Sequence, residues 1–285
     1  MRATIARRRW VRQASRYRSA MKLCLARALS MLALALGAAL PGGCSTGATV
    51  TVLSYNIHHG EGTDEVFDLE RIARIITASG ADLVALQEVD VGTARAGGVD
   101  QAAELARLTG MRHVFGQAIP YRGGSYGDAI LTRLPLSREI VWPLPALPQH
   151  EGRVAVGGIV ELPGGSSLRF LGTHLDHTDG DEDRVSQAQA LLALCFPAGD
   201  EPPTATLLVG DLNSEPDSEP MRLLLEHFVS AAPGGLPSYP SEAPVKAIDW
   251  VLLAPADAWQ VVSIETLDEP VASDHAPVRA VLRYR

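Results

Sequence analysis

Carboxylate, amide and imidazole side chains recur at the ends of short apolar stretches in this sequence of 285 residues. Carboxylate and amide oxygens suit Mg²⁺ or Mn²⁺, and a nearby histidine can exchange a proton close to neutral pH. A single acid after a strand is most often a turn former or a helix cap, whereas six such segments in one chain indicate a site able to bind a hard cation or a phosphate. The segments are Ser-Tyr-Asn56, Leu-Gln-Glu88, Gly-Thr-His174, Gly-Asp211-Leu-Asn213, Ile-Asp249-Trp and Ser-Asp274-His275.

The stretches that carry these groups alternate between strand and helix patterns. Helical spacing, with Asp68 as an expected N-cap and Gly80 as a stop, predicts helices at 68–79, 99–108, 183–194 and 219–228. Apolar runs predict strands at 50–56, 82–87, 128–132, 154–162, 167–173, 206–209, 247–253, 261–266 and 277–283, with a hairpin turn at 163–166. Several strands follow one another directly, which favours an α/β sandwich of mixed sheets over a purely parallel sheet.

These elements are expected to form one domain over residues 45–285. The Pro- and Gly-rich stretch 231–244 is interpreted as a surface loop inside that domain. Cys195 is expected to be a buried helical thiol, and no disulfide framework is expected from the three cysteines of the chain. The protein is expected to be a monomer.

In their order along the chain, these segments resemble the endonuclease/exonuclease/phosphatase family, whose fold resembles that of DNase I. Tyr-Gly-Asp-Ala-Ile-Leu-Thr-Arg at 126–133 belongs to the same pattern, which covers roughly residues 50–283. Gly-Asp-Leu-Asn combined with a C-terminal Ser-Asp-His is highly specific. The resemblance implies a four-layered α/β sandwich of two mixed β-sheets flanked by helices.

The resemblance also implies a Mg²⁺ or Mn²⁺ cofactor. It makes Glu88 the principal metal ligand, assisted by Asn56, and places Asp274 on the metal side. Asp211 and Asn213 would position the nucleophilic water or hold a second metal ion. Metal and imidazolium charge lower the cost of the pentacoordinate phosphorus state, while a carboxylate activates water.

Four residues are the catalytic candidates implied by the same resemblance. His275 would contact the scissile phosphate or take a proton, and Asp249 would orient it. His174 would stabilise charge that develops on the phosphate oxygens or the leaving group. The general base stays open, with Asp211 among the candidates, and both histidine rings are expected to face one pocket.

Further candidates lie beside the expected site. The loop after the first predicted strand holds His58, His59 and Glu61, which are either substrate or metal contacts or part of a solvated polar loop. His177 and Arg184 are candidate phosphate contacts. For Arg184 the reason is its guanidinium, which is a natural phosphate clamp. Two residues, His150 and Arg153, rank below these, and Tyr239 is expected to be plain loop.

Asp128 departs from the family pattern, which commonly has asparagine at this position. An amide can donate a hydrogen bond to phosphate, whereas an ionised carboxylate cannot. Asp128 is therefore expected to be a metal ligand or protonated, or else the phosphate contact is weaker in this protein.

Residues 1–44 are interpreted as an export signal. The apolar run 28–40 follows Lys22 and Arg27 and precedes Pro-Gly-Gly-Cys44, which resembles a bacterial lipobox. We therefore favour an envelope lipoprotein attached to the membrane through a lipidated Cys44, with signal cleavage and secretion as the alternative. Met21 is favoured as the true start, since it opens a compact signal by itself.

Charge separates the functional alternatives. Residues 44–285 hold 16 Lys and Arg against 33 Asp and Glu, a formal charge of −17, which disfavours a nucleic-acid partner. The first hypothesis is a phosphodiesterase or phosphatase acting on a lipid head group or small phosphate ester, since relatives include sphingomyelinase-like enzymes and proteins of glycosylphosphatidylinositol-anchor remodelling. The alternatives are an extracellular nuclease and a non-catalytic lipoprotein that uses the fold for binding.

Overall fold

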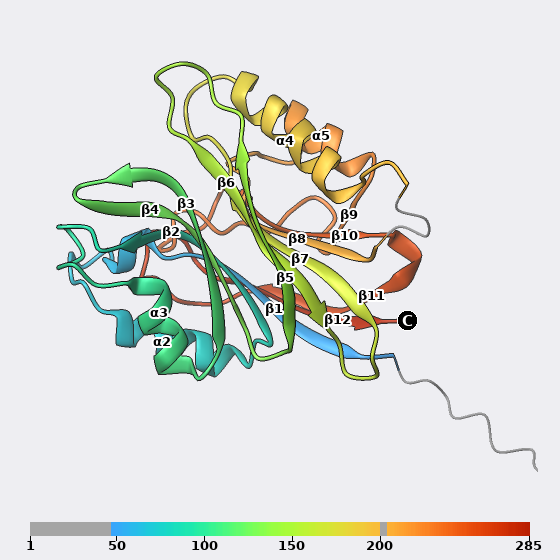
Figure 1. The fold of residues 1–285 in the computed structure, drawn as a ribbon, viewed down its shortest axis with the longest axis horizontal. Helices are drawn as coiled ribbons and strands as arrows, with labels where there is room; N and C mark the ends of the chain where they lie inside the picture. The colour runs from blue at the N-terminus through green and yellow to red at the C-terminus, as the bar shows by residue number, and fades with distance from the viewer. Residues whose placement is uncertain (1–46, 200–203) are drawn as a thin grey trace, which may run out of the picture. The chain divides into compact units, whose positions relative to one another are not determined.

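Two six-stranded β-sheets lie face to face in the computed structural model, which describes residues 47–199 and 204–285. The first sheet has the strand order β11-β12-β1-β2-β4-β3 and the second has the order β5-β6-β7-β8-β10-β9 (Figure 1). Both sheets are mixed, because β1 runs parallel to β2 and β7 parallel to β8 while the other pairs are antiparallel. The strands of the first sheet are β1 (Thr49–Asn56), β2 (Leu83–Val91), β3 (Arg112–Tyr121), β4 (Gly124–Thr132), β11 (Trp259–Thr266) and β12 (Val278–Tyr284), and those of the second are β5 (Leu136–Leu144), β6 (Arg153–Glu161), β7 (Ser167–His174), β8 (Thr206–Asp211), β9 (Val229–Ser230) and β10 (Asp249–Ala254).

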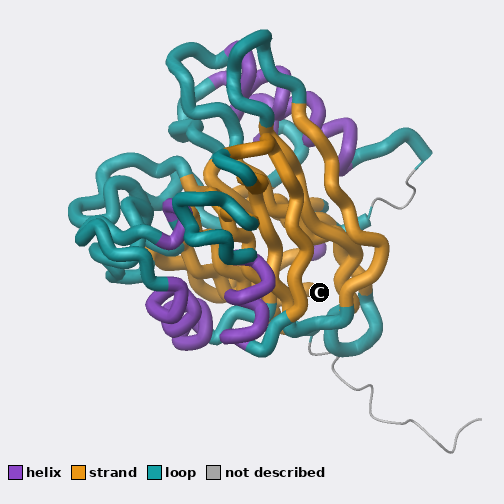
Figure 2. The backbone as a smooth tube through the Cα atoms, turned by 60° about the vertical axis from the view of Figure 1, so that its left-hand side comes forward, coloured by secondary structure: helices purple, strands orange, loops and turns teal. Residues whose placement is uncertain are grey.

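Helices cover the outer face of each sheet (Figures 1 and 2). One apolar cluster fills the space between the sheets and includes Val52, Phe170 and Val209. A second cluster lies under α2 (Leu69–Ser79) and α3 (Gln101–Thr109), and a third lies under α4 (Glu182–Cys195) and α5 (Glu219–Leu225). The layers are therefore helix, sheet, sheet, helix, which confirms the four-layered α/β sandwich.

Local sequence signals explain where the first two helices begin and end. Asp68 accepts a hydrogen bond from the main-chain N–H of Arg71, and Asp100 caps α3 in the same way. Gly80 and Gly110 end the helices with positive φ angles of 66° and 68°, a conformation that favours glycine. Cys195 is buried at the end of α4, as predicted.

The strands missing from the sequence prediction are β3, β5 and β9, and each of them is an edge strand. An edge strand needs no continuous apolar pattern, and most residues of β5 are exposed or half-buried. The predicted strand 82–87 begins one residue before the longer β2, the predicted strand 128–132 is part of β4, and the helix predicted at 219–228 ends at Leu225.

Strand direction determines where the polar strand ends meet. Parallel β7 and β8 end side by side with His174 opposite Asp211, and antiparallel β10 begins with Asp249 opposite Asp211. In the other sheet β1 ends at Asn56, opposite Gln87 of β2. The candidate residues of both sheets thus gather at one end of the sandwich.

Two short 3-10 turns complete the described part of the chain, η1 (His58–Gly60) and η2 (Ala256–Ala258). Within the described residues, no helix has both the length and the apolar character needed to cross a membrane. The predicted export signal at 1–44 lies outside the described residues.

Candidate active site

Asp211 lies at the centre of the candidate site, and the residue is 1% exposed. The Asn56 side-chain amide donates to Asp211 Oδ2 at 3.2 Å, which links the two sheets, and it also donates to Glu88 Oε1 at 3.1 Å. The main-chain N–H of Asn213 donates to the other Asp211 oxygen at 2.9 Å. Asn56 from the end of β1 and Asn213 from the turn after β8 therefore hold the Asp211 carboxylate, and Asn56 joins it to Glu88 of β2.

A β-bulge delivers Glu88 to this place. The register of β2 against β4 shifts between Leu86 and Val89, and Glu88 has a positive φ of 59°. A bulge redirects a side chain that regular alternation would place elsewhere, and here Glu88 borders the central pocket. The backbone irregularity therefore positions the predicted principal metal ligand.

Two histidines flank Asp211. His174 Nε2 lies 3.5 Å and His275 Nε2 lies 3.6 Å from Asp211 Oδ2. His275 Nδ1 lies 2.9 Å from Asp249 Oδ2, and the Ser238 hydroxyl donates to the same oxygen at 2.6 Å. The two rings come from segments about a hundred residues apart in sequence and meet at one carboxylate, as the resemblance implied.

A polar pocket of about 690 Å³ opens above these groups. Of the predicted residues, Asn56, His58, Asp128 and Asp249 are not part of the wall that the described residues form, although Asn56 and Asp249 contact residues that are. The predicted residues that do border the pocket are Glu88, His174, His177, Arg184, Asp211, Asn213, Asp274 and His275.

A model of the endonuclease/exonuclease/phosphatase family matches residues 53–275. The chain belongs to this family. Members of the family hydrolyse phosphoesters, so the protein is a phosphoester hydrolase in general terms.

Solved structures share the fold at low sequence identity. An endonuclease/exonuclease/phosphatase from Beutenbergia cavernae is 24% identical with a TM-score of 0.67, over 83% of this chain and 72% of that one. A mannosyl-6-phosphatase of Bacteroides thetaiotaomicron is 17% identical with a TM-score of 0.66, over 82% of this chain and 100% of that one. The catalytic domain of human Nocturnin, with a bound sulfate, is 19% identical with a TM-score of 0.64, over 83% of this chain and 95% of that one.

The two histidines of this family member differ in charge. Burial alone would lower the pKa of His275, but Asp249 and Asp211 outweigh burial and raise it to about 10. Burial, Arg153 and His275 together hold the pKa of His174 well below its ordinary value. At neutral pH an imidazolium and a neutral imidazole therefore stand on either side of Asp211.

The pKa of Asp211 lies near neutral pH. Burial raises the pKa of its carboxyl to about 7, although His275 and the hydrogen bonds from Asn213 and Asn56 oppose that rise. A group that titrates near the working pH can both accept and release a proton. This property makes Asp211 a physically suitable general base for water.

Arg153 is a site residue that the sequence interpretation ranked too low. It opens β6, is 3% exposed, and lies with Nη1 3.2 Å from His174 Nδ1 and Nη2 2.8 Å from His177 Nδ1. A guanidinium can only donate, so His174 Nδ1 accepts from Arg153, while His174 Nε2 lies 2.9 Å from the side-chain amide nitrogen of Asn213 and 3.5 Å from Asp211 Oδ2. The signal in the sequence that could have identified Arg153 is its position as a charged residue at the start of an otherwise apolar strand.

Tyr239 was also underestimated as plain loop. Its ring lies 4.8 Å from the His275 ring, centroid to centroid, and it borders the pocket. Nothing in the Pro- and Gly-rich sequence around it indicates that this loop folds back over the histidine.

Arg184 has a different geometry from the predicted phosphate clamp. Its guanidinium donates to the main-chain oxygens of Asp176, Thr178 and Gly180 and to the Asp181 carboxylate. Although Arg184 borders the pocket, these bonds favour a role in holding the 176–181 loop in place.

The donor set fits a hard divalent cation. Carboxylates of Glu88, Asp211 and Asp274 border one pocket, which matches the oxygen ligands that Mg²⁺ and Mn²⁺ require. Asn56 turns its amide nitrogen toward Glu88 and Asp211, while its oxygen accepts from the His58 N–H. In this arrangement Asn56 orients the carboxylates of Glu88 and Asp211. The second oxygen of Glu88 is then the one available to bind the ion.

Asp128 is 2% exposed, and burial raises its pKa well above the ordinary value for a carboxyl, which favours the protonated form. A protonated carboxyl resembles the amide that is common in the family, because both can donate a hydrogen bond. We therefore expect Asp128→Asn to retain most of the wild-type kcat/KM without lowering Tm. Asp128→Ala, which removes the hydrogen bond from the His174 main chain, should destabilise the fold by about 1–3 kcal/mol.

Steady-state kinetics and thermal melts of both variants test this prediction. A folded Asp128→Asn variant with little activity would instead show that Asp128 works as an ionised carboxylate.

Proposed function

We propose that the protein is a Mg²⁺- or Mn²⁺-dependent phosphodiesterase or phosphatase that acts on a lipid head group or small phosphate ester at the cell envelope. The observation that carries this proposal is the placement of Asp211 between the Glu88–Asn56 pair and the two histidines, with Glu88, Asp211 and both histidines at one polar pocket.

The side chains divide the chemistry between them. A divalent ion held at Glu88 would supply a Lewis acid that polarises a phosphate oxygen. Asp211 accepts a proton from the attacking water, and the His275 imidazolium donates a hydrogen bond to the phosphate. His174 stabilises charge on the phosphate oxygens or the leaving group.

Size and charge support a small ester as the substrate. The pocket of about 690 Å³ accommodates a phosphate and a head group, and the −17 charge of residues 44–285 disfavours a long polyanion. The mannosyl-6-phosphatase of similar fold is named for a small sugar phosphate. A lipid or sugar phosphate is thus favoured over nucleic acid.

Attachment to the envelope is part of the proposal and rests on the sequence around Cys44. The wild-type protein should partition into detergent, and Cys44→Ala should release it or prevent its processing. Recovery of all wild-type protein from the culture supernatant, with a non-cysteine N-terminus, would reject lipidation.

A substrate panel tests the activity. The purified protein is incubated with bis-nitrophenyl phosphate, phospholipid head-group esters, sugar phosphates and plasmid DNA, each with Mg²⁺ and with EDTA. Hydrolysis of a small or lipid ester that stops in EDTA supports the proposal, whereas cleavage confined to DNA would support the nuclease. Full turnover after exhaustive chelation, or no turnover of any ester by folded protein, contradicts it.

The pH profile provides a separate prediction through Asp249. His275 acts as an imidazolium below its pKa of about 10, which the Asp249 charge raises. Asp249→Asn removes that charge, so the pKa of His275 falls and the proton is lost at lower pH. We expect the alkaline limb of kcat/KM to move to lower pH in this variant. Ser238→Ala removes one hydrogen bond but keeps the Asp249 charge, so its alkaline limb should stay near the wild-type position. If the alkaline limb lies at the same pH in wild type and both variants, Asp249 does not raise the pKa of His275.

A further inference from the structure

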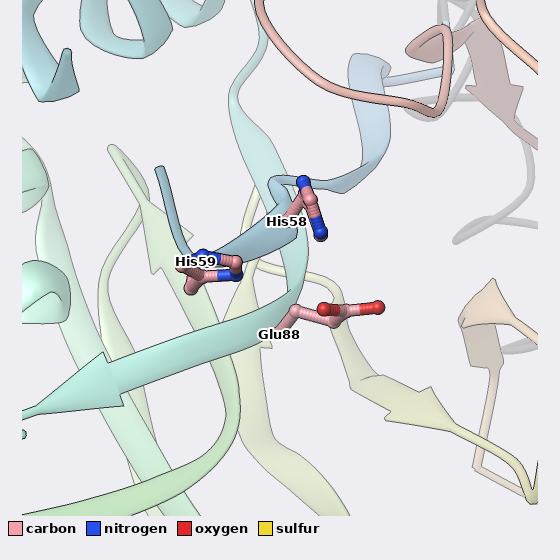
Figure 3. Close-up of side chains that lie close together, drawn as sticks. All are labelled: His58, His59 and Glu88. Carbon is pink, nitrogen blue, oxygen red and sulfur yellow. The ribbon is translucent and has the colours of Figure 1, made fainter. Parts of the chain in front are cut away.

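His58, His59 and Glu88 form a cluster beside the hydrolytic pocket. One ligand atom from each residue lies within 4.8 Å of the others, and Figure 3 shows both rings and the carboxylate turned toward one space. The rings make an edge contact, with centroids 4.5 Å apart. In the part of the chain that the structure describes, the pocket wall includes Glu88 but neither histidine. The cluster therefore approaches Glu88 from outside that wall.

An uncommon backbone conformation presents the two rings. His58, His59 and Gly60 have consecutive positive φ angles of 43°, 45° and 83°, which is rare for residues other than glycine. The Asn56 side chain accepts from the His58 N–H at 3.1 Å, and Gln101 donates to the His59 carbonyl at 2.6 Å. Such strain persists only where surrounding contacts hold it, most often at functional sites.

Glu61 lies beside one nitrogen of each ring. His58 Nδ1 lies 3.1 Å from the Glu61 carbonyl, which can only accept, so Nδ1 carries the hydrogen and Nε2 keeps its lone pair. His59 Nε2 lies 3.6 Å from the Glu61 carboxylate. His59 is 9% exposed, and its Nδ1 is buried without a hydrogen-bond partner. His58 therefore has one nitrogen held by an oxygen and the other free, which is the usual arrangement of a metal-ligating histidine.

We propose that His58, His59 and Glu88 bind a transition-metal ion of the zinc class. Two imidazole nitrogens and one carboxylate favour Zn²⁺ over Mg²⁺, which requires oxygen ligands. Ligand atoms of a single zinc ion lie about 3–4 Å apart, and the ligand atoms of this cluster lie within 4.8 Å of one another. The three side chains therefore move slightly closer together when the ion binds. This site is additional to the Mg²⁺ site of the proposed function, and the two share Glu88.

Zinc binding by the full-length protein tests the proposal. Zn²⁺ is titrated by calorimetry and Co²⁺ by visible absorption into wild type, His58→Asn and His59→Asn. Asparagine is chosen because it tolerates the left-handed conformation of this turn. Each variant should lower the Zn²⁺ affinity by about 100-fold or more, since outer-shell partners alone are typically worth about 10–100-fold. His113→Asn, an exposed position on β3, is the matched control and should bind Zn²⁺ as the wild type does.

The hydrolytic pocket could also take zinc through His275, so His275→Asn is titrated in parallel. Retention of tight binding in His275→Asn with loss in the His58 and His59 variants supports the proposed site. Loss only in His275→Asn, or wild-type affinity in both loop variants, overturns it. Hydrolysis with Mg²⁺ is measured separately on the wild type. Ester turnover without zinc binding rejects this site alone, whereas zinc binding without turnover rejects the proposed function alone.

Discussion

Asp211→Asn is expected to lower kcat about 10³-fold, the upper range for removal of one preorganised polar group from a catalytic site, while Tm stays equal to or above the wild-type value. The carboxylate accepts hydrogen bonds from Asn56 and Asn213 and lies within 3.6 Å of both His174 and His275. The amide keeps the shape but cannot take the proton of the attacking water.

The expected thermal stability follows from the sign of the pKa shift. Burial raises the pKa of Asp211 from 3.8 to about 7 in the folded protein, so the ionised carboxylate opposes folding once the pH exceeds the unfolded pKa. This destabilisation grows as the pH rises toward about 7, and an asparagine does not suffer it. Functional groups that are buried with an unfavourable charge commonly trade stability for activity in this way.

Kinetics and thermal melts at neutral pH test both parts of the prediction. Asp257→Asn, at an exposed position of η2, is the matched control and should change neither kcat nor Tm. An active Asp211→Asn variant would remove Asp211 from the chemistry. A variant that is inactive because it has unfolded would show that the carboxylate supports the fold.

The sequence could predict which groups meet, because strand ends are governed by direction and register. Asn56, His174 and Asp211 each terminate an apolar strand, and pairs of parallel strands end on the same edge. A fold of two such sheets brings both edges to one end. Predicting that these side chains meet therefore required only the strand pattern and the family resemblance.

Other features of the site depend on packing that no single segment encodes. Arg153 acts through its distances to His174 and His177, which lie on the neighbouring β7 and the loop after it. Tyr239 reaches His275 from an irregular loop, and Arg184 is engaged by loop carbonyls that sequence spacing cannot place. The edge strands β3 and β5 escaped prediction for a related reason, since partial exposure removes the apolar pattern that reveals a buried strand.

Glu88→Gln is expected to reduce kcat/KM by about 10²-fold or more and to raise the Mg²⁺ concentration needed for half-maximal activity. Glutamine preserves the length of the side chain and one carbonyl oxygen, but it lacks the negative charge that a hard cation requires. The bulge that turns Glu88 into the pocket is a property of the backbone, so the fold should persist and thermal melts should stay cooperative. Loss of preorganised charge stabilisation at a reacting centre typically has an effect of this size.

The measurement is a Mg²⁺ titration of hydrolysis rate, combined with calorimetric Mg²⁺ binding that does not depend on turnover. Glu70→Gln, an exposed glutamate on α2, provides the matched loss of one negative charge and should behave as the wild type. If saturating Mg²⁺ restores the full rate of Glu88→Gln, Glu88 contributes affinity for the ion and little else. If the rate stays low at saturation, the charge of Glu88 also serves the reaction itself, because the ion is then bound but less well placed beside Asp211. Unchanged Mg²⁺ affinity and unchanged rate would contradict the assignment of Glu88 as the principal ligand, since Glu88 is the first-sheet carboxylate at the pocket that Asn56 joins to Asp211.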